Sequence, residues 1–404
     1  MPKTIMRFMA CSDLHYKDDP DCIEKQRFDE GLRQLYAYAD AQPYKSVDAV
    51  YIVGDFADRG SLQQMKNVKD SLDRGIRPGT LVNLSLASHE WFGENGEAGG
   101  RERFASVFGQ EPETHRVIGG FHFVSVSCTD GCHYRAPQQK FVAEALDAAH
   151  RADPKKPVFF FQHPHPTNTV YGSIGWGCAD LMPILVNYPQ IITFSGHSHA
   201  PINDPRSIHQ EHFTSVGTGT FSYFELDEFD KTYGTFPPLK EVAAQMLIVE
   251  ARDDGSVRIL PWDVIAGRPF PGLEDGWIVE RPWDPDSFTY TREKRERCTY
   301  HPYFPEKARL DAAVKDGVLQ LAFDHAACEE ERVNDYVITV RDAHGDIERR
   351  FVLWSPFFVT DMPERMTWEI PAPPAGEYSV EIRAHGFWNN PSEDCLTGNF
   401  SVCD

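Results

Sequence analysis

Five short apolar runs in the first half of the chain each end in a residue type that binds metal ions. The endings are Asp13-Leu14-His15, Gly54–Gly60, Ala87–Glu90, Gln162–Pro164 and Gly196–His199. Amphipathic helical segments separate these runs, and such strand–helix alternation predicts an α/β domain. Ligands bind at the carboxyl ends of the strands in an open α/β sheet, so we expect the five endings to meet at one edge.

The periodicity of apolar residues places the helices and strands. Helices are predicted near 24–42, 61–74 and 137–151. The first should turn one apolar face inward, formed by Phe28, Leu32, Leu35, Tyr36 and Ala39; the second should do so with Leu62, Met65 and Leu72. The predicted strands are Ile5–Cys11, Ala49–Val53, Leu81–Leu86, Phe121–Ser127, Val158–Phe161 and Ile191–Phe194.

The pattern changes in the last third of the chain. We predict an α/β domain over 1–268, an ordered connector rich in proline and aromatic residues over 269–308, and an all-β domain over 309–404. Short strands separated by turn residues, with a hairpin loop at Asp342–Asp346, favour a β-sandwich of immunoglobulin or fibronectin III type.

The charge balance excludes some partners. The 404 residues carry a formal net charge of −21. Binding to a nucleic acid duplex or an anionic membrane rests on clustered basic residues, so neither is expected. No apolar run reaches the length of a membrane span, and the start does not resemble a secretion signal. We expect a cytoplasmic protein whose nine cysteines are mostly reduced, with Cys128 and Cys132 in structural or surface positions.

The order and spacing of the five endings resemble the calcineurin-like metallophosphoesterase superfamily in a bacterial form with an added C-terminal sandwich. The family pattern is D-x-H, G-D-x-x-D-R, G-N-H-E/D, a single His and G-H-x-H. The resemblance implies a two-sheet sandwich flanked by helices, with two divalent metal ions (manganese, iron or zinc) in a cleft. By motif position, one ion would be held by Asp13, His15, Asp55 and His199. The other would be held by Asp55, Ser88, His163 and His197.

The same resemblance implies catalytic roles. His89 would donate a proton to the leaving group or contact the phosphate, the Asp58 carboxylate would hold its ring, and Arg59 would contact a phosphate oxygen. The alternative for Asp58 and Arg59 is a structural salt bridge near a helix start. For Glu90, a solvated or helix-capping carboxylate is favoured over a catalytic one.

The third ending departs from the family, because Ser88 stands where an asparagine ligand is expected and Ala87 replaces glycine. A serine hydroxyl is a poorer metal ligand than an amide carbonyl, and its side chain is shorter. Three interpretations stay open: the second ion binds weakly, a water substitutes for the amide, or the chain is an inactivated variant.

We therefore predict metal-dependent hydrolysis of a small soluble phosphate ester, with a phosphodiester slightly preferred over a phosphomonoester. The preference rests on aromatic residues near the endings, such as Trp176 and Phe92. One alternative is a non-catalytic or weakly active metal-binding scaffold, which Ser88 motivates. Another is hydrolysis of a non-phosphate ester or a phosphonate by the same ions.

Overall fold

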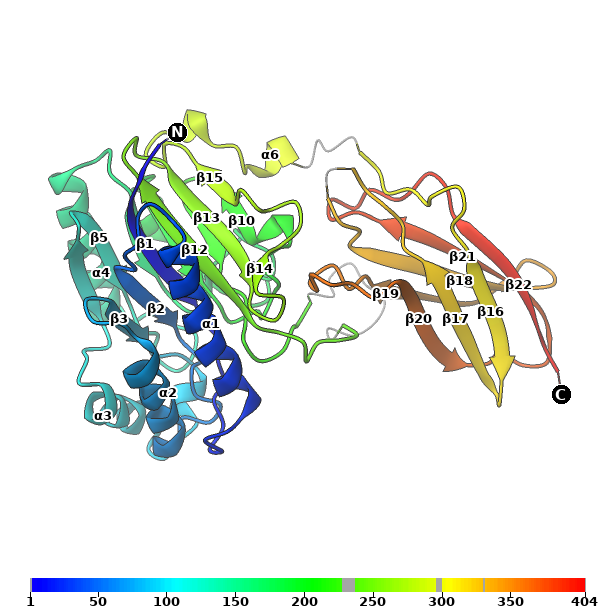
Figure 1. Ribbon diagram of the computed structural model, residues 1–404, viewed down its shortest axis with the longest axis horizontal. Helices are drawn as coiled ribbons and strands as arrows, with labels where there is room; N and C mark the ends of the chain where they lie inside the picture. Colours follow the sequence, from blue (N-terminus) through cyan, green and yellow to red (C-terminus); the bar gives the residue numbers. More distant parts are fainter. Residues whose placement is uncertain (1, 227–236, 296–299, 330, 404) are drawn as a thin grey trace. The chain divides into compact units, whose positions relative to one another are not determined.

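The computed structural model describes residues 2–226, 237–295, 300–329 and 331–403, which form two compact units (Figure 1). The first comprises 1–226 and 240–294, and the second comprises 227–239 and 295–404. Residues 296–299 of the predicted connector lie outside the described residues. Two short strands of that connector region, β14 (Arg268–Pro269) and β15 (Trp277–Val279), pair with β13 (Val257–Asp263) of the first unit. The domain boundaries at 268 and 309 stay a prediction.

The first unit contains two sheets. One has the order β14-β13-β12-β1-β2-β3, with β15 also on β13. Its further strands are β1 (Thr4–Cys11), β2 (Ala49–Val53), β3 (Leu81–Ser85) and β12 (Gln245–Arg252). Strands β1, β2 and β3 run parallel, so their carboxyl ends share one edge of the sheet.

The second sheet has the order β10-β11-β9-β6-β5-β4. Its strands are β4 (Thr114–Ile118), β5 (Phe121–Ser125), β6 (Val158–Phe161), β9 (Ile191–Ser195), β10 (Ile208–Gln210) and β11 (Thr214–Gly217). Strands β5, β6 and β9 are parallel, and β6 and β9 carry the fourth and fifth endings. A separate two-stranded ribbon pairs β7 (His165–Pro166) with β8 (Gly177–Cys178).

Alternating side chains hold the two sheets face to face and attach helices outside them. Phe8 of β1 packs with Phe159 and Phe194 of the second sheet, in an aromatic core between the sheets. The next residue, Met9, points the other way, into a cluster with Phe28 of helix α1. The predicted two-sheet sandwich flanked by helices is confirmed.

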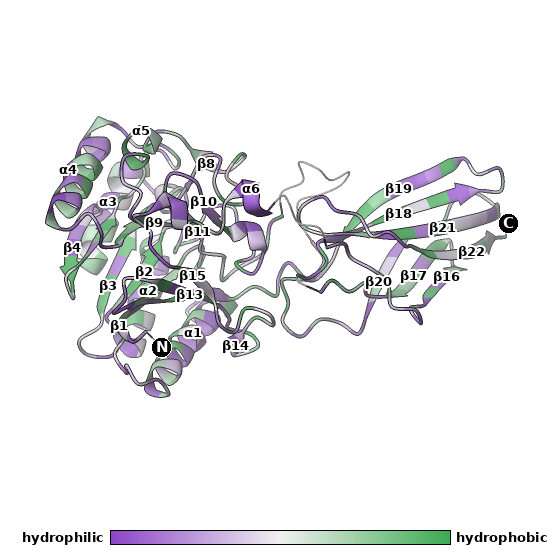
Figure 2. Ribbon diagram, turned by 90° about the horizontal axis from the view of Figure 1, so that it is seen from above, coloured by the Kyte–Doolittle hydropathy of each residue, from purple (hydrophilic) through white to green (hydrophobic). Residues whose placement is uncertain are grey.

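The helices cover the outer faces of the sandwich. They are α1 (Ile23–Asp40), α2 (Leu62–Gly75), α3 (Gly96–Phe108), α4 (Ala136–Ala152) and α5 (Met182–Leu185). Both α1 and α4 carry hydrophobic and hydrophilic residues in stripes (Figure 2). The apolar face predicted for α1 is buried. Leu62 was predicted to point inward and is 41% exposed, because α2 begins at that residue and its first turn lies at the surface.

Several short elements complete the first unit. Three single-turn 3-10 helices span His89–Trp91, Pro205–Ser207 and Pro285–Ser287, and a short α6 spans Arg292–Arg295. Helix α2 starts with a capping box, in which the Ser61 side chain accepts from the Gln64 amide and the Gln64 side chain reaches back. The box fixes the chain between β2 and α2, where Asp55 to Gly60 lie. Among the residues that the structure describes, no helix has the length and apolar character to cross a membrane.

The second unit is the predicted all-β sandwich. A three-stranded sheet has the order β16-β17-β20, and a four-stranded sheet has the order β19-β18-β21-β22. Their strands are β16 (Leu310–Lys315), β17 (Val318–Asp324), β18 (Asp335–Asp342), β19 (Ile347–Trp354), β20 (Arg365–Pro371), β21 (Gly376–His385) and β22 (Leu396–Val402). Phe323, Tyr336 and Val380 lie in the core that both sheets share. The predicted hairpin loop at 342–346 joins β18 to β19.

Candidate metal centre

The five strand endings converge, as the parallel strands require. Ligand atoms of Asp13, His15 and His199 lie within 4.8 Å of one another, as do those of Asp55, His163 and His197. A third group of the same tightness joins His15 and Asp55 to His89. The endings of β1, β2 and β3 thus meet those of β6 and β9 at one point. The sequence-predicted residues Asp13, His15, Asp55, His89, His163, His197 and His199 are brought together.

Asp55 lies at the middle of the cluster. Its Oδ2 is 2.9 Å from Nε2 of His163, and its Oδ1 accepts a 2.9 Å hydrogen bond from the His89 backbone amide. The other ring nitrogen of His163, Nδ1, is 2.6 Å from the Val53 carbonyl oxygen. An Nδ1–H that donates to this carbonyl leaves Nε2 free to act as a ligand toward the Asp55 side.

Asp13 and His199 form the other half. Oδ1 of Asp13 is 3.2 Å from Nε2 of His199, and Nε2 of His15 is 3.1 Å from the same nitrogen. Nδ1 of His199 lies 3.0 Å from the Tyr223 carbonyl oxygen, which fixes the ring. On the opposite side, Oδ2 of Asp13 accepts from the Ser12 hydroxyl and from the His197 amide.

The backbone is strained at this site. Asp13, His15, Asp55, His197 and His199 all have positive φ angles, between 48° and 77°. Non-glycine residues rarely adopt this region, and such strain concentrates at functional sites, where the surrounding structure holds it in place. Gly54, at φ 84°, allows the close packing, because a Cβ there would come within 2.7 Å of the His163 ring.

The donor set fits divalent metal ions. Oδ1 of Asp13 and Nδ1 of His15 are buried without a hydrogen-bond partner in the structure. The two Nε2 atoms of His15 and His199 face each other, although two neutral imidazoles can share only one proton between them. A mixture of imidazole and carboxylate suits first-row divalent metals, and an ion shared by Asp13, His15 and His199 would satisfy Oδ1 of Asp13 and the two facing Nε2 atoms.

The charges of the cluster shift its pKa values in opposite directions. Burial alone would raise the pKa of Asp13, yet His199 and His163 hold it well below its usual value. Burial lowers the pKa of His163, but Asp55 and Asp13 outweigh it and raise that pKa to about 10. The pKa of His197 falls to about 4, chiefly through burial and the charge of His163. The two carboxylates thus make His163 strongly basic, whereas His197 stays neutral.

His89 stands at the partly exposed side of the cluster. Its ring lies edge-on to that of His15, with centroids 4.3 Å apart. The expected hydrogen bond from its ring to the Asp58 carboxylate is wrong: Nδ1 lies 2.6 Å from the backbone carbonyl oxygen of Asp58. The carboxylate forms an ion pair with Lys17 at 2.6 Å instead. A carbonyl accepts only from an N–H, so this contact places the proton on Nδ1 and leaves Nε2 free.

Arg59 does not join the cluster in this structure. Its side chain is 80% exposed, and its Nε lies 3.9 Å from Oδ2 of Asp58. The alternative of a surface ion pair near the start of a helix describes the observed contact, with α2 beginning at Leu62.

Ser88 lies beside Asp55, and its hydroxyl donates to both carboxylate oxygens, at 3.1 and 3.3 Å. The Ser88 side chain therefore reaches the Asp55 carboxylate. Its observed role is that of a hydrogen-bond donor to Asp55, since a hydroxyl proton is what the carboxylate accepts.

Glu90 has a role that the sequence did not indicate. It is fully buried, and its carboxylate accepts from the backbone amides of Asp55 (3.1 Å), Ala57 (2.9 Å) and Ala87 (2.8 Å). It thus joins the loops after β2 and β3. Burial, followed by the negative charge of Asp55, raises the pKa of Glu90 to about 8. The expectation of a solvated carboxylate is wrong, because Glu90 is buried and links two strand ends.

Two aromatic rings and a thiol border the cluster. Trp176 is 39% exposed, and its ring centroid lies 5.2 Å from that of His197. Phe92 is 61% exposed and lies 4.7 Å from the His89 ring. Sγ of Cys132 is 3.9 Å from Nε2 of His197. Cys132 had been expected in a structural or surface position, since no spacing signal links it to the five endings.

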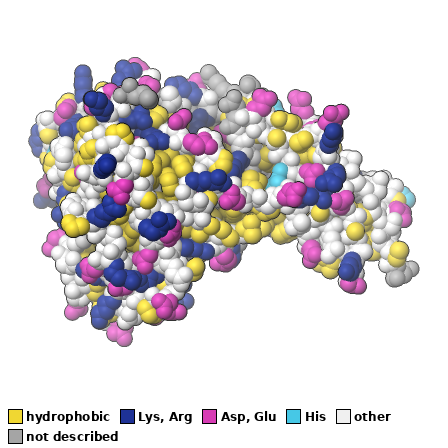
Figure 3. Space-filling model, in the orientation of Figure 1, with side chains coloured by type: hydrophobic (Ala, Val, Ile, Leu, Met, Phe, Trp, Pro, Cys, Tyr) yellow, Lys and Arg dark blue, Asp and Glu magenta, His cyan; other side chains and the backbone are white. Residues whose placement is uncertain are grey.

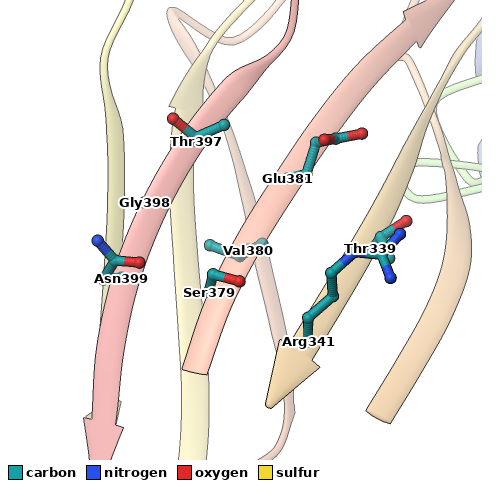
Figure 4. A pocket seen from close by; sticks show the side chains of 8 residues that line it. All are labelled: Thr339, Arg341, Ser379, Val380, Glu381, Thr397, Gly398 and Asn399. Carbon is teal, nitrogen blue, oxygen red and sulfur yellow. The ribbon is translucent and has the colours of Figure 1, made fainter. Parts of the chain in front are cut away.

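The second unit carries a hollow of a different kind. Eight residues line it, on strands β18, β21 and β22 (Figure 4): Thr339, Arg341, Ser379, Val380, Glu381, Thr397, Gly398 and Asn399. The lining is polar and holds one acidic and one basic side chain, Glu381 and Arg341. It lacks the imidazole groups that mark the cluster in the first unit, and Glu381 is its one carboxylate.

The chain has been compared with known proteins. A search of curated proteins finds no match. Among solved structures, a purple acid phosphatase from yellow lupin (Lupinus luteus) seeds has 14% sequence identity and a TM-score of 0.49, over 70% of this chain and 54% of that one. The chain thus spans about half the length of that structure. CopC from Methylosinus trichosporium OB3b has 16% identity and a TM-score of 0.17, over 26% of this chain and 92% of that one.

A family model matches the part of the chain that carries the cluster. Residues 6–201 match the model described as Calcineurin-like phosphoesterase, and every residue of the cluster from Asp13 to His199 lies in this range. The part of the chain that builds the site is therefore similar to the calcineurin-like phosphoesterase family.

Proposed function

We propose that the protein hydrolyses a small phosphodiester at two divalent metal ions held by the clustered side chains. The observation that carries the proposal is the meeting of two carboxylates and five histidines, from five separate strand ends, within one group of contacts. Two adjoining groups within that cluster have the composition of a paired-ion site.

The residues divide between two ions by their contacts. Asp13, His15 and His199 form one group, and His163 and His197 form the other with Asp55. Asp55 also belongs to a group with His15 and His89, so its carboxylate is placed to serve both ions. When bound, such ions supply Lewis acidity and lower the pKa of a water so that it attacks phosphorus. Manganese, iron or zinc fits this donor set.

His89 is proposed as the proton donor to the leaving oxygen. Its Nδ1–H donates to the Asp58 carbonyl, so Nε2 is the nitrogen that would carry the second proton of the imidazolium form and give it to the leaving oxygen. The Asp58 carboxylate acts on the site through two other side chains. It forms an ion pair with Lys17, and its Oδ1 lies 3.8 Å from Nδ1 of His15. Arg59, which is exposed, is proposed to reach a phosphate oxygen only by moving its side chain.

The aromatic rings support the preference for a diester. Trp176 and Phe92 stand beside His197 and His89, on two sides of the cluster. Exposed rings at the edge of a phosphate site offer stacking surfaces for a base or another planar substituent. A diester has a second substituent for such a surface, whereas a small monoester does not. A nucleotide-type diester is the substrate class we propose.

The surface agrees with a small substrate. On the face seen in Figure 3, Lys and Arg side chains are interspersed with Asp and Glu, and the whole chain has a net charge of −21. A nucleic acid duplex or an anionic membrane is therefore not a proposed partner. A cytoplasmic location is part of the same proposal.

Turnover of two chromogenic esters tests this proposal. The full chain is stripped with a chelator, reloaded with Mn²⁺ or Zn²⁺, and assayed on bis(p-nitrophenyl) phosphate and p-nitrophenyl phosphate. We expect metal-dependent release from both esters, with a higher kcat/KM for the diester. Trp176→Ala should raise KM for a nucleoside diester more than for the chromogenic one.

The second candidate is a scaffold that binds metal without turnover. The observation that favours it is Ser88, whose hydroxyl donates to Asp55 where the family has an amide ligand. Bound metal without hydrolysis of either ester, in the presence of each of the three metals, would favour the scaffold over the enzyme.

A further inference from the structure

We infer that the thiol of Cys132 is a ligand of the second metal ion and supplies the donor that Ser88 lacks. The inference rests on the proposed function and deepens it, because it concerns the ion held by Asp55, His163 and His197. It also predicts which metal that position selects.

The first observation is the place of the thiol. Sγ of Cys132 is 3.9 Å from Nε2 of His197. That nitrogen is one of three ligand atoms, with those of Asp55 and His163, that lie within 4.8 Å of one another. Zinc binds thiolate at about 2.3 Å and imidazole at about 2.0 Å, so an ion can touch both atoms when they lie within about 4.3 Å. Cys132 is not a member of that group, so its side chain would share the ion by turning Sγ from its place beside His197 toward Asp55 and His163.

The second observation is that the segment carrying Cys132 packs directly on Ser88. A Cβ at Gly131 would lie 3.0 Å from Cβ of Ser88. The residue before Cys132 therefore packs beside the position where the family has its amide ligand. The Ser88 hydroxyl itself is engaged with Asp55. The turn that carries the Cys132 thiol thus adjoins position 88, where the family has an amide ligand.

The third observation is that the backbone turn that carries the thiol is held in place. Thr129 and His133 exchange backbone hydrogen bonds of 2.7 and 3.2 Å, which close a tight hairpin around Asp130, Gly131 and Cys132. Asp130 and Gly131 have φ angles of 44° and 94°, as a sharp turn requires. The Cys128 thiol donates to the Gly131 carbonyl at 3.2 Å and ties the hairpin to the domain. Ligands held on a constrained turn bind ions with little loss of conformational freedom.

The chemistry of the site changes as a result. A thiol binds metal as thiolate, so its proton leaves to solvent on binding and the S–metal bond replaces the S–H bond. The second position would then have one sulfur, one carboxylate and two imidazoles. Sulfur is a soft ligand that favours zinc over manganese, whereas an amide oxygen does not discriminate in that way. The second position should therefore prefer zinc.

A second thiol cluster provides a matched control. His133, Cys178 and Asp180 also place ligand atoms within 4.8 Å of one another, near the surface. Asp180 is engaged there with the Tyr134 amide, at 2.9 Å, and with His133, at 3.1 Å. Replacing Cys178 removes a thiol from the same region of the fold without touching the ligands of either ion. Cys178→Ser thus separates a thiolate signal at the centre from one at the surface.

The test uses the full chain, kept under a reductant that does not bind metal, stripped with a chelator, reloaded with Co²⁺ and freed of excess ion by gel filtration. We expect two cobalt ions per chain and a thiolate-to-cobalt charge-transfer band in the near ultraviolet. Cys132→Ser should lose the band and retain one ion. Cys178→Ser should keep both. The double variant Cys132→Ser/Ser88→Asn should bind two ions without the band. Circular dichroism shows whether each variant is folded.

Three results would overturn the inference: a band that persists in folded Cys132→Ser, a band that disappears in Cys178→Ser, or a parent chain that binds no second ion. X-ray absorption on the zinc-loaded chain gives an independent check, since one zinc-bound sulfur at about 2.3 Å is expected. A chain that binds two ions and shows the cobalt band, but does not hydrolyse the esters, would support Cys132 as a ligand and contradict the proposed function. Failure of the inference and failure of the proposed function are therefore distinguishable.

Discussion

Nε2 of His163 lies 2.9 Å from Oδ2 of Asp55, although β6 and β2, which deliver the two residues, belong to different sheets. This contact joins the two halves of the sandwich at the site. Nδ1 of the same ring lies 2.6 Å from the carbonyl oxygen of Val53, which belongs to the strand that carries Asp55. The relative position of the sheets therefore sets the geometry of the cluster, and packing between the sheets is coupled to ligand placement.

Removing the shared carboxylate should abolish most of the activity. Asp55→Asn keeps the size of the side chain but removes the charge that pairs with His163. Bound ions contribute several kcal/mol to the transition state, so kcat/KM should fall by about three orders of magnitude. The assay is ester turnover with metal counted per chain. A variant that loses less than about tenfold, with both ions retained, would contradict a bridging role.

Metal affinity should rise with pH. Burial opposes protonation of His163, but Asp55 and Asp13 outweigh it and raise its pKa to about 10. Because histidine binds metal in the neutral form, an ion that binds near neutral pH must displace this proton. The Kd for Mn²⁺ should therefore increase as the pH falls from about 9 to about 6. Calorimetry in two buffers of different ionisation enthalpy measures the released proton. A Kd that is independent of pH would exclude His163 as a ligand.

Loss of His89 should depend on the leaving group. His89→Gln removes a proton donor, which typically contributes about 10²- to 10⁴-fold to a rate. Alkyl leaving groups need the proton more than p-nitrophenolate does, so kcat should fall more for an alkyl diester than for the aryl one. Equal losses on both esters would indicate that His89 binds the phosphate and does not donate a proton.

Glu90 should stabilise the fold as well as the site. Glu90→Ala leaves three buried amides without an acceptor, and each buried unpaired donor costs about 1–3 kcal/mol. Relief of the carboxylate's own burial offsets part of this loss. The free energy of unfolding in urea should fall by about 3 kcal/mol, and by less in Glu90→Gln, which retains one acceptor oxygen. Glu94→Ala, at an exposed position nearby, is the control. A change within about 0.5 kcal/mol in Glu90→Ala would contradict the linking role.

The sequence predicted what depends on local pattern and strand direction. Apolar runs followed by Asp or His placed the ligands at strand ends, and parallel pairing brought them together, as Asp13 and Asp55 illustrate. It missed α3, whose Gly96, Gly99 and Gly100 weaken the helical pattern. Packing of Gly100 against Trp91 and of Phe104 against Phe56 stabilises this helix. In the second unit it missed β16 and β22.

Tertiary contacts decided the remaining details of the site. The partner of His89 is a backbone carbonyl of Asp58, and a carbonyl carries no sequence signal. Cys132 reaches His197 through a hairpin that is far from it in the sequence. Neither contact follows from spacing, because each depends on how a loop packs after the sheets have formed.

Anomalous diffraction from crystals of the zinc-loaded chain tests the central claim most directly, because it locates the ions without reference to activity. Two peaks about 3.5–4 Å apart are expected, one beside Asp13 and His199 and one beside His163 and His197, with Asp55 between them. Peaks absent from this cluster, or found only among other residues, would contradict the account.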